Sequence, residues 1–224
     1  MNFKKLIVDS GLKMLNGGYT VETWGNISCR DPETQRVYIT PSGMDYSTLC
    51  EDDVVVVDLD ANVLEGKRRP SIETGLHCAI YRAREDVNAV VHTHPIYSTV
   101  FSCIGEDIPM LIDEAAQCMG DVCRTTEYAL PGSVEIAQNC IKALGQKANS
   151  CLLKSHGAVC VAGDMPSAFR VVKVLEVTAQ MYQMIRAMNC QYHPISQENI
   201  EKMQYFVCHC YGQDCPEPTP PAKL

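Results

Sequence analysis

Three histidines in this chain have types and spacing that could bind a metal ion. His92 and His94 stand at the end of the apolar run 87–91. Side chains at positions i and i+2 of a strand share one face, so a strand here would aim both imidazoles in one direction. His156 likewise follows a short apolar run. Catalytic zinc commonly takes three protein ligands and leaves a fourth position for water or substrate. The sequence therefore predicts a zinc site at two strand ends; the alternative is surface or core histidines.

Glu73 is a candidate acid/base residue or a further metal ligand. Ser71 predicts the N-cap of a helix over 71–84, and a carboxylate in its first turn is favoured by the helix dipole. A residue there is also close to any ligand at the helix N-terminus. The alternative is a Glu that only offsets the dipole. His77, one turn further on, is interpreted as a helix partner.

Two glycine-containing turns could bind a phosphate group. They contain Gly25 with Asn26 and Ser42 with Gly43, and they offer backbone N–H groups, an amide and a hydroxyl without a fixed positive charge. Such a group of donors suits an anion. Together with Ser71 at a helix N-terminus, the two turns predict a phosphate site.

Regular elements alternate along the chain, and they must position these residues. Hydrophobic periodicity and turn signals predict the helices 2–16, 71–84, 96–104, 133–144, 166–188 and one from 196. Strands are predicted over 27–30, 36–40, 54–59, 62–65, 87–91 and 108–111, together with a strand that ends at His156 and pairs with 158–161. Four prolines after 215 predict an extended tail.

Composition indicates one domain in a reducing compartment. The 224 residues are 46% hydrophobic, enough for a sizeable single core. The net charge of −8 supplies no basic patch, so nucleic acid and anionic membranes are not expected as partners. No signal or membrane-spanning segment is recognised, and we expect a cytoplasmic protein.

Thirteen scattered cysteines suit that location as buried apolar residues. Cys208, His209, Cys210 and Cys215 are a weaker candidate for a second metal site.

Several of these motifs, in order and with similar spacing, resemble the class II aldolase/adducin family, and most closely its zinc-dependent L-fuculose-1-phosphate aldolases. The resemblance covers about the first nine-tenths of the chain. It is carried by the segments 25–28, 40–43, 69–73, 92–94 and 155–157. It implies a three-layer α/β/α single domain with a central, mostly antiparallel sheet over residues 1–210, followed by a Pro-rich tail over 211–224. It also implies a homotetramer with active sites between subunits.

The resemblance assigns roles to the candidate residues. It implies one zinc ion per subunit, held by His92, His94 and His156, with Glu73 as the acid/base. The substrate phosphate would lie among Gly25, Asn26, Ser42, Gly43 and Ser71.

The implied reaction cleaves a ketose 1-phosphate into dihydroxyacetone phosphate and an aldehyde through a zinc-stabilised enediolate. Glu73 would move the proton on the enediolate carbon, and we expect burial and the substrate phosphate to raise its pKa toward neutrality. A Schiff-base mechanism is not expected, because it would need a buried lysine and Lys154 is the one lysine inside an apolar run.

Two departures from these aldolases bear on the reaction. Ile72 replaces a second phosphate-contacting serine. The tyrosine that exchanges the proton of the aldehyde oxygen is absent, and Asp113 and Glu114 follow the Ile-Pro dipeptide instead. One of these acids could serve another reaction at the same zinc site, namely epimerisation, dehydration or decarboxylation of a sugar phosphate. Alternatively, both acids are surface groups, and a C-terminal tyrosine, Tyr205 or Tyr211, reaches a neighbouring site. Adducin-like interaction modules lack the metal ligands, whereas this chain has all of them.

Overall fold

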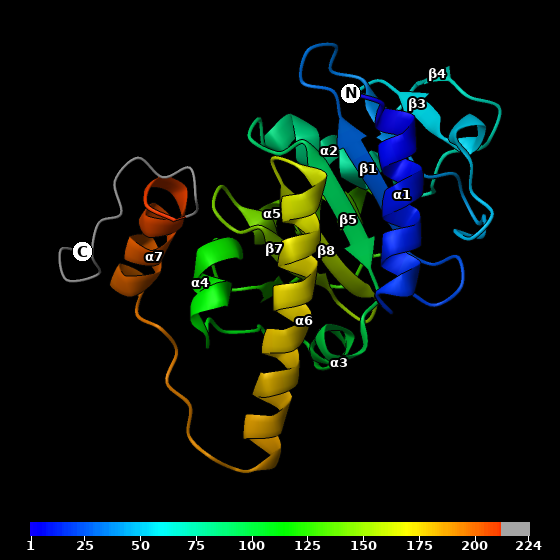
Figure 1. Cartoon of the computed structure of the whole chain (residues 1–224). Helices are drawn as coiled ribbons and strands as arrows, with labels where there is room; N and C mark the ends of the chain where they lie inside the picture. Colours follow the sequence, from blue (N-terminus) through cyan, green and yellow to red (C-terminus); the bar gives the residue numbers. More distant parts are fainter. Residues whose placement is uncertain (212–224) are drawn as a thin grey trace.

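The chain is built on one eight-stranded sheet, as the computed structural model shows for residues 1–211 (Figure 1). The strands are β1 (Asn26–Arg30), β2 (Val37–Ile39), β3 (Val55–Val57), β4 (Val63–Glu65), β5 (Ala89–Thr93), β6 (Arg124–Thr125), β7 (Ser150–Leu153) and β8 (Gly157–Ala162). Their order across the sheet is β4-β3-β2-β1-β5-β8-β7-β6. Every pairing is antiparallel except that of β6 with β7.

Seven α-helices are found in the described residues. They are α1 (Phe3–Asn16), α2 (Thr74–Ala83), α3 (Ile96–Ile104), α4 (Asp113–Cys118), α5 (Val134–Leu144), α6 (Met165–Ala187) and α7 (Gln197–His209). Side-chain caps that accept a backbone N–H open α5 at Ser133, α6 at Asp164 and α7 at Ser196.

Helices cover both faces of the sheet, which gives the predicted three-layer α/β/α fold. Helices α2 and α5 share one core cluster with Val90 and Val159. The other cluster joins residues of α1, α3, α4, α6 and α7 to Val91 and Ala158 on the opposite face. Because both faces are covered, β5 is buried along its whole length, which is why its first three residues, Ala89, Val90 and Val91, are all apolar.

Two predicted elements differ from the structure, and two observed elements were not predicted. The strand expected over 108–111 is only an isolated bridge between Ile108 and Cys123, because Pro109 has no N–H to continue a ladder. The short helix α4 and the two-residue strand β6 were not expected. Helix α2 begins at Thr74 instead of Ser71, since the Ser71 carbonyl accepts the Thr74 N–H in a tight turn.

The C-terminal prediction falls largely outside the described residues. Of the segment 211–224, only Tyr211 is described. Among residues 1–211, no helix combines the length and the apolar character needed to cross a membrane.

Candidate active site

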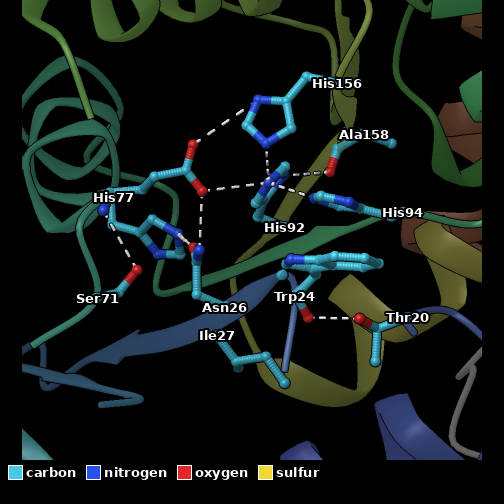
Figure 2. Close-up of polar contacts among 12 residues, drawn as sticks. Thr20, Trp24, Asn26, Ile27, Ser71, His77, His92, His94, His156 and Ala158 are labelled. Atoms are coloured by element: carbon cyan, nitrogen blue, oxygen red, sulfur yellow. Dashed lines mark hydrogen bonds and ion pairs between the residues drawn. The ribbon is translucent and has the colours of Figure 1, made fainter. Parts of the chain in front are cut away.

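The three predicted histidines meet at one end of the central strands (Figure 2). His92 lies on β5 and shares a face with Val90, so it points toward the α2 side of the sheet. His94 follows the end of β5, and His156 stands in the turn between β7 and β8. Their ligand nitrogens lie within 4.8 Å of one another, and no other such group of metal-binding side chains occurs in residues 1–211.

The geometry of the three imidazoles fits a metal ion. The Nε2 atom of His92 lies 3.0 Å from Nε2 of His94 and 3.3 Å from Nε2 of His156. Tetrahedral zinc with Zn–N bonds of about 2.05 Å would separate neighbouring nitrogens by about 3.3 Å. The Nδ1 atom of His92 lies 3.0 Å from the Ala158 carbonyl oxygen and donates to it, which leaves the Nε2 lone pair of a neutral ring facing the other rings. A cation satisfies these converging lone pairs.

Two glycines allow the backbone to pack closely around the histidines. A Cβ at Gly157 would lie 2.5 Å from the Thr93 carbonyl oxygen and 2.8 Å from Cδ2 of His94. Gly25 has φ +75°, and a Cβ there would lie 2.6 Å from the His92 carbonyl oxygen. Larger residues at either position would displace the strand end that carries His92 and His94.

Glu73 brings a buried carboxylate to the same place. It is the N-cap residue of α2 and is 3% exposed. Its Oε2 atom lies 3.2 Å from Nε2 of His92 and accepts a 2.8 Å hydrogen bond from Nδ2 of Asn26. Its Oε1 atom is buried, has no hydrogen-bond partner among residues 1–211 and lies 3.9 Å from Nδ1 of His156. One carboxylate oxygen is therefore held by the protein, and the other remains available for a substrate proton.

The pKa values of the site favour a neutral imidazole at His94 and at His156 and a charged carboxylate at Glu73. Burial, together with the nearby His92, lowers the pKa of His94 to about 3 and that of His156 to about 4. Burial acts to raise the pKa of Glu73, but attraction to His92 and the Asn26 hydrogen bond outweigh it, so the net shift is downward. The expected upward shift is therefore wrong for the protein without substrate, because the close contact of Glu73 with His92 and its hydrogen bond from Asn26 were not foreseen.

The candidate phosphate-binding residues line one cavity of about 640 Å³ beside the histidines. Gly25, Ser42, Gly43 and Ser71 come to it from three separate loops and Asn26 from the start of β1, and Glu73, His94 and His156 line it as well. The backbone N–H groups of Ser42 and Ser71 already donate to Arg69 and Thr40 carbonyl oxygens. Hydroxyl and amide side chains are therefore better placed than these two N–H groups to bind an anion.

Other candidate residues lie away from this cavity in the single chain. Asp113 and Glu114 are exposed in the first turn of α4, and Tyr205 on α7 and Tyr211 just beyond it are also exposed. None of the four lines the cavity. The predicted cluster of Cys208, His209, Cys210 and Cys215 extends beyond the described residues at Cys215, and its other members form no metal-binding group in residues 1–211.

Sequence reasoning missed further residues of the site. Trp24, Ser155 and Pro131 also line the cavity. His77, interpreted only as a helix partner, is fully buried and hydrogen bonds to Asn26. The sequence signal for its place in the site was the spacing of four residues between Glu73 and His77, which brings the two side chains together on one helix.

Comparison with known proteins places the chain in a family. Residues 5–183 match the model of the class II aldolase and adducin N-terminal domain. The chain belongs to this family. It is 36% identical over 176 residues to a 5-deoxy-D-ribulose 1-phosphate aldolase of Bacillus thuringiensis serovar kurstaki, covering 79% of this chain and 82% of the relative. This class II aldolase family is metal-dependent, and its aldolases are lyases, so the chain is an enzyme of that class.

Two further similarities bear on fold and reaction. An L-fuculose 1-phosphate aldolase structure superposes with a TM-score of 0.87 at 34% identity, over 91% of this chain and 94% of that one. An L-ribulose-5-phosphate 4-epimerase UlaF of Salmonella paratyphi B is 32% identical over 209 residues, covering 89% of this chain and 92% of the relative.

Proposed function

We propose that this enzyme is a zinc-dependent aldolase that cleaves a ketose 1-phosphate, similar to L-fuculose 1-phosphate, into dihydroxyacetone phosphate and an aldehyde. The observation that carries the proposal is the convergence of three histidine Nε2 atoms beside a buried carboxylate with one unpartnered oxygen. The relatives named as sugar 1-phosphate aldolases support the same reaction.

His92, His94 and His156 would hold the zinc ion. When bound, zinc would supply a Lewis acid that stabilises the negative charge left on the three-carbon fragment after the carbon–carbon bond breaks. The carbonyl of Ala158 fixes the orientation of His92 and leaves its Nε2 free to bind metal.

Glu73 would transfer the proton at C3 of the dihydroxyacetone phosphate fragment. Within the described part of the chain its Oε1 atom has no hydrogen-bond partner, while the hydrogen bond from Asn26 to Oε2 holds the carboxylate in place. In cleavage Glu73 gives a proton to this carbon, and in synthesis it removes the same proton. The donor to Oε2 favours the charged form, which is the form required of a base in the synthetic direction.

The substrate phosphate would bind at the other end of the cavity. Ser71 accepts a 3.2 Å hydrogen bond from the Glu73 N–H, which leaves its hydroxyl hydrogen free to donate to an anion. Asn26, Ser42, Gly25 and Gly43 complete this side. No lysine or arginine of the described residues lines the cavity, so hydroxyl, amide and backbone groups would bind the anion. Ile72 lines the cavity with an exposed apolar side chain where a serine would add one more donor.

Association of subunits would complete the site. Ile96, Val100 and Ile104 form an exposed apolar stripe at helical spacing on α3, the helix that follows His94, and they are 72%, 38% and 56% exposed. A neighbouring copy in a homotetramer would cover such a stripe. Asp113, Glu114, Tyr205 or Tyr211 could then reach the cavity of that neighbour. Buried cysteines such as Cys29, Cys78 and Cys160 are free thiols, which supports a cytoplasmic location.

A second candidate uses the same zinc site to epimerise, dehydrate or decarboxylate a sugar phosphate. It is favoured by the acidic residues Asp113 and Glu114 in place of the tyrosine, and by the similarity to the epimerase. One experiment separates the two functions. Zinc-loaded enzyme is incubated with L-fuculose 1-phosphate and with L-ribulose 5-phosphate, and the products are identified by NMR. Dihydroxyacetone phosphate from the first supports the aldolase, whereas a changed C4 configuration in the second with no cleavage of the first supports the epimerase.

A further inference from the structure

A buried histidine lies directly behind the candidate acid/base residue. His77 is on α2, one turn after Glu73, and is 0% exposed. Its Nε2 atom lies 2.6 Å from Oδ1 of Asn26, and its Nδ1 atom lies 2.6 Å from Oγ of Ser28 (Figure 2 shows His77 beside Asn26). His77 is not among the residues that line the cavity, so any effect on the reaction must pass through its partners.

These partners extend the contact into a continuous chain of hydrogen bonds. At one end, Nδ2 of Asn26 donates to Oε2 of Glu73 at 2.8 Å. At the other end, Oγ of Ser28 lies 2.7 Å from the Tyr81 hydroxyl. Asn26 and Ser28 lie on the same face of β1, opposite His92 and Val90 of β5, and that face packs against α2. The chain therefore connects the sheet, the helix and the carboxylate.

The chemistry of each group allows only one direction for these hydrogen bonds. A carboxylate accepts only, so the Asn26 amide must turn its Nδ2 toward Glu73 and its Oδ1 toward His77. The amide oxygen also accepts only, so His77 must carry its hydrogen on Nε2. Burial lowers the pKa of His77 to about 3, so the ring is neutral and its Nδ1 accepts from the Ser28 hydroxyl. The Ser28 oxygen then accepts from Tyr81.

We propose that His77 is a positioning residue, which fixes the Asn26 amide and through it the Glu73 carboxylate. Rotating the amide by 180° would place its oxygen against Oε2 of Glu73 and its nitrogen against the Nε2–H of His77, and both contacts would be repulsive. The Nε2–H tautomer of His77 excludes that orientation. Because Asn26 lines the cavity, its second Nδ2 hydrogen is left for a substrate oxygen.

Two variants of His77 separate positioning from packing. His77→Gln keeps one donor and one acceptor on the side chain and can support the same direction of hydrogen bonds. His77→Phe fills the space with no polar atom. Ile80→Val, a buried substitution on the same helix within the α2–α5 core cluster, is the control for a general loss of packing. If His77→Phe does not fold, Ser28→Ala removes the donor that holds the His77 tautomer.

The kinetic test rests on the proposed function. With zinc bound, His77→Phe should slow exchange of the C3 proton of dihydroxyacetone phosphate at least about tenfold with little change in KM, whereas His77→Gln and Ile80→Val stay within about threefold. If Ser28→Ala is needed, its exchange rate should lie between that of His77→Phe and that of His77→Gln. Exchange by folded, zinc-loaded His77→Phe at the wild-type rate would overturn the proposal.

A second readout does not depend on the reaction. ¹⁵N NMR of the zinc-loaded protein should show His77 with its hydrogen on Nε2, and the Asn26 side-chain amide signals should shift in His77→Phe but not in His77→Gln. An Nδ1–H tautomer, or Asn26 signals unchanged in His77→Phe, would overturn the positioning role. If the wild-type protein does not exchange the proton at all, the proposed aldolase function fails, and the NMR result alone decides the role of His77.

Discussion

Glu176 on α6 supplies the N-terminal cap of α3, the helix that begins two residues after His94. Its two carboxylate oxygens accept the N–H groups of Tyr97 and Ser98 at 2.8 and 2.9 Å, and Oε2 also accepts from Ser98 Oγ at 2.9 Å. Pro95, which occupies the N-cap position of α3, makes no side-chain hydrogen bond to the helix. A distant carboxylate therefore replaces the local cap, and it also adds a negative charge at the positive end of the helix.

Glu176→Ala should destabilise the protein by about 2 kcal/mol. Loss of an N-cap costs about 0.5–2 kcal/mol, and a charged acceptor for two N–H groups lies at the upper end of that range. Glu176→Gln keeps one accepting oxygen and should lose about 1 kcal/mol. Because α3 follows His94 so closely, Glu176→Ala should also weaken zinc binding about tenfold.

Urea unfolding of the metal-free protein measures the first effect, and competition with a chromophoric chelator measures the second. Lys173→Ala, at an exposed position on the same helix, is the control and should change stability by less than about 0.5 kcal/mol. If both Glu176 variants behaved like Lys173→Ala in unfolding, the capping argument would be wrong. Unchanged zinc affinity with a clear loss of stability would refute only the link from α3 to His94.

Three further predictions concern the metal, the missing acid and the pH dependence. His94→Ala should lose zinc and activity together, which metal analysis after purification and a cleavage assay would show. Asp113→Asn and Glu114→Gln, made separately, should differ: the variant that removes the acting acid should lower turnover at least about tenfold, and equal, wild-type rates would exclude both. The pKa of His77 is about 3 when folded and 6.5 when unfolded, so its contribution to stability is complete above pH 6.5 and is lost as pH falls below it. Between pH 7.5 and 5.5 the wild type should therefore lose about 1.4 kcal/mol more in urea unfolding than His77→Gln, and parallel losses would contradict the buried neutral ring.

The cluster of three histidines was predictable because its sequence signal is local. His92 lies on a strand whose apolar run reflects burial on both faces, and His94 follows the end of that strand. His156 lies in a tight turn after another buried strand. The same pattern, a histidine at the end of a buried apolar segment, therefore indicates both parts of the cluster. The family resemblance supplied the three-layer fold, and the match over residues 5–183 confirms that family.

The remaining features depend on contacts between distant segments. The capping carboxylate of α3 lies 78 residues along the chain from Ser98, and no local pattern indicates it. The pKa of Glu73 is lowered by a histidine and an amide from two different strands. The start of α2 was misplaced because the Ser71 hydroxyl and carbonyl form their own turn before the helix. Short elements such as α4 and β6 have too few residues for a periodic pattern.

Proton exchange without an aldehyde tests the central claim most directly. Zinc-loaded enzyme is incubated with dihydroxyacetone phosphate in heavy water, and loss of the C3 proton signal is followed by NMR. We predict exchange by the wild type, and a loss of orders of magnitude in Glu73→Gln with zinc retained. No exchange by the wild type, or near-normal exchange by Glu73→Gln, would contradict the account.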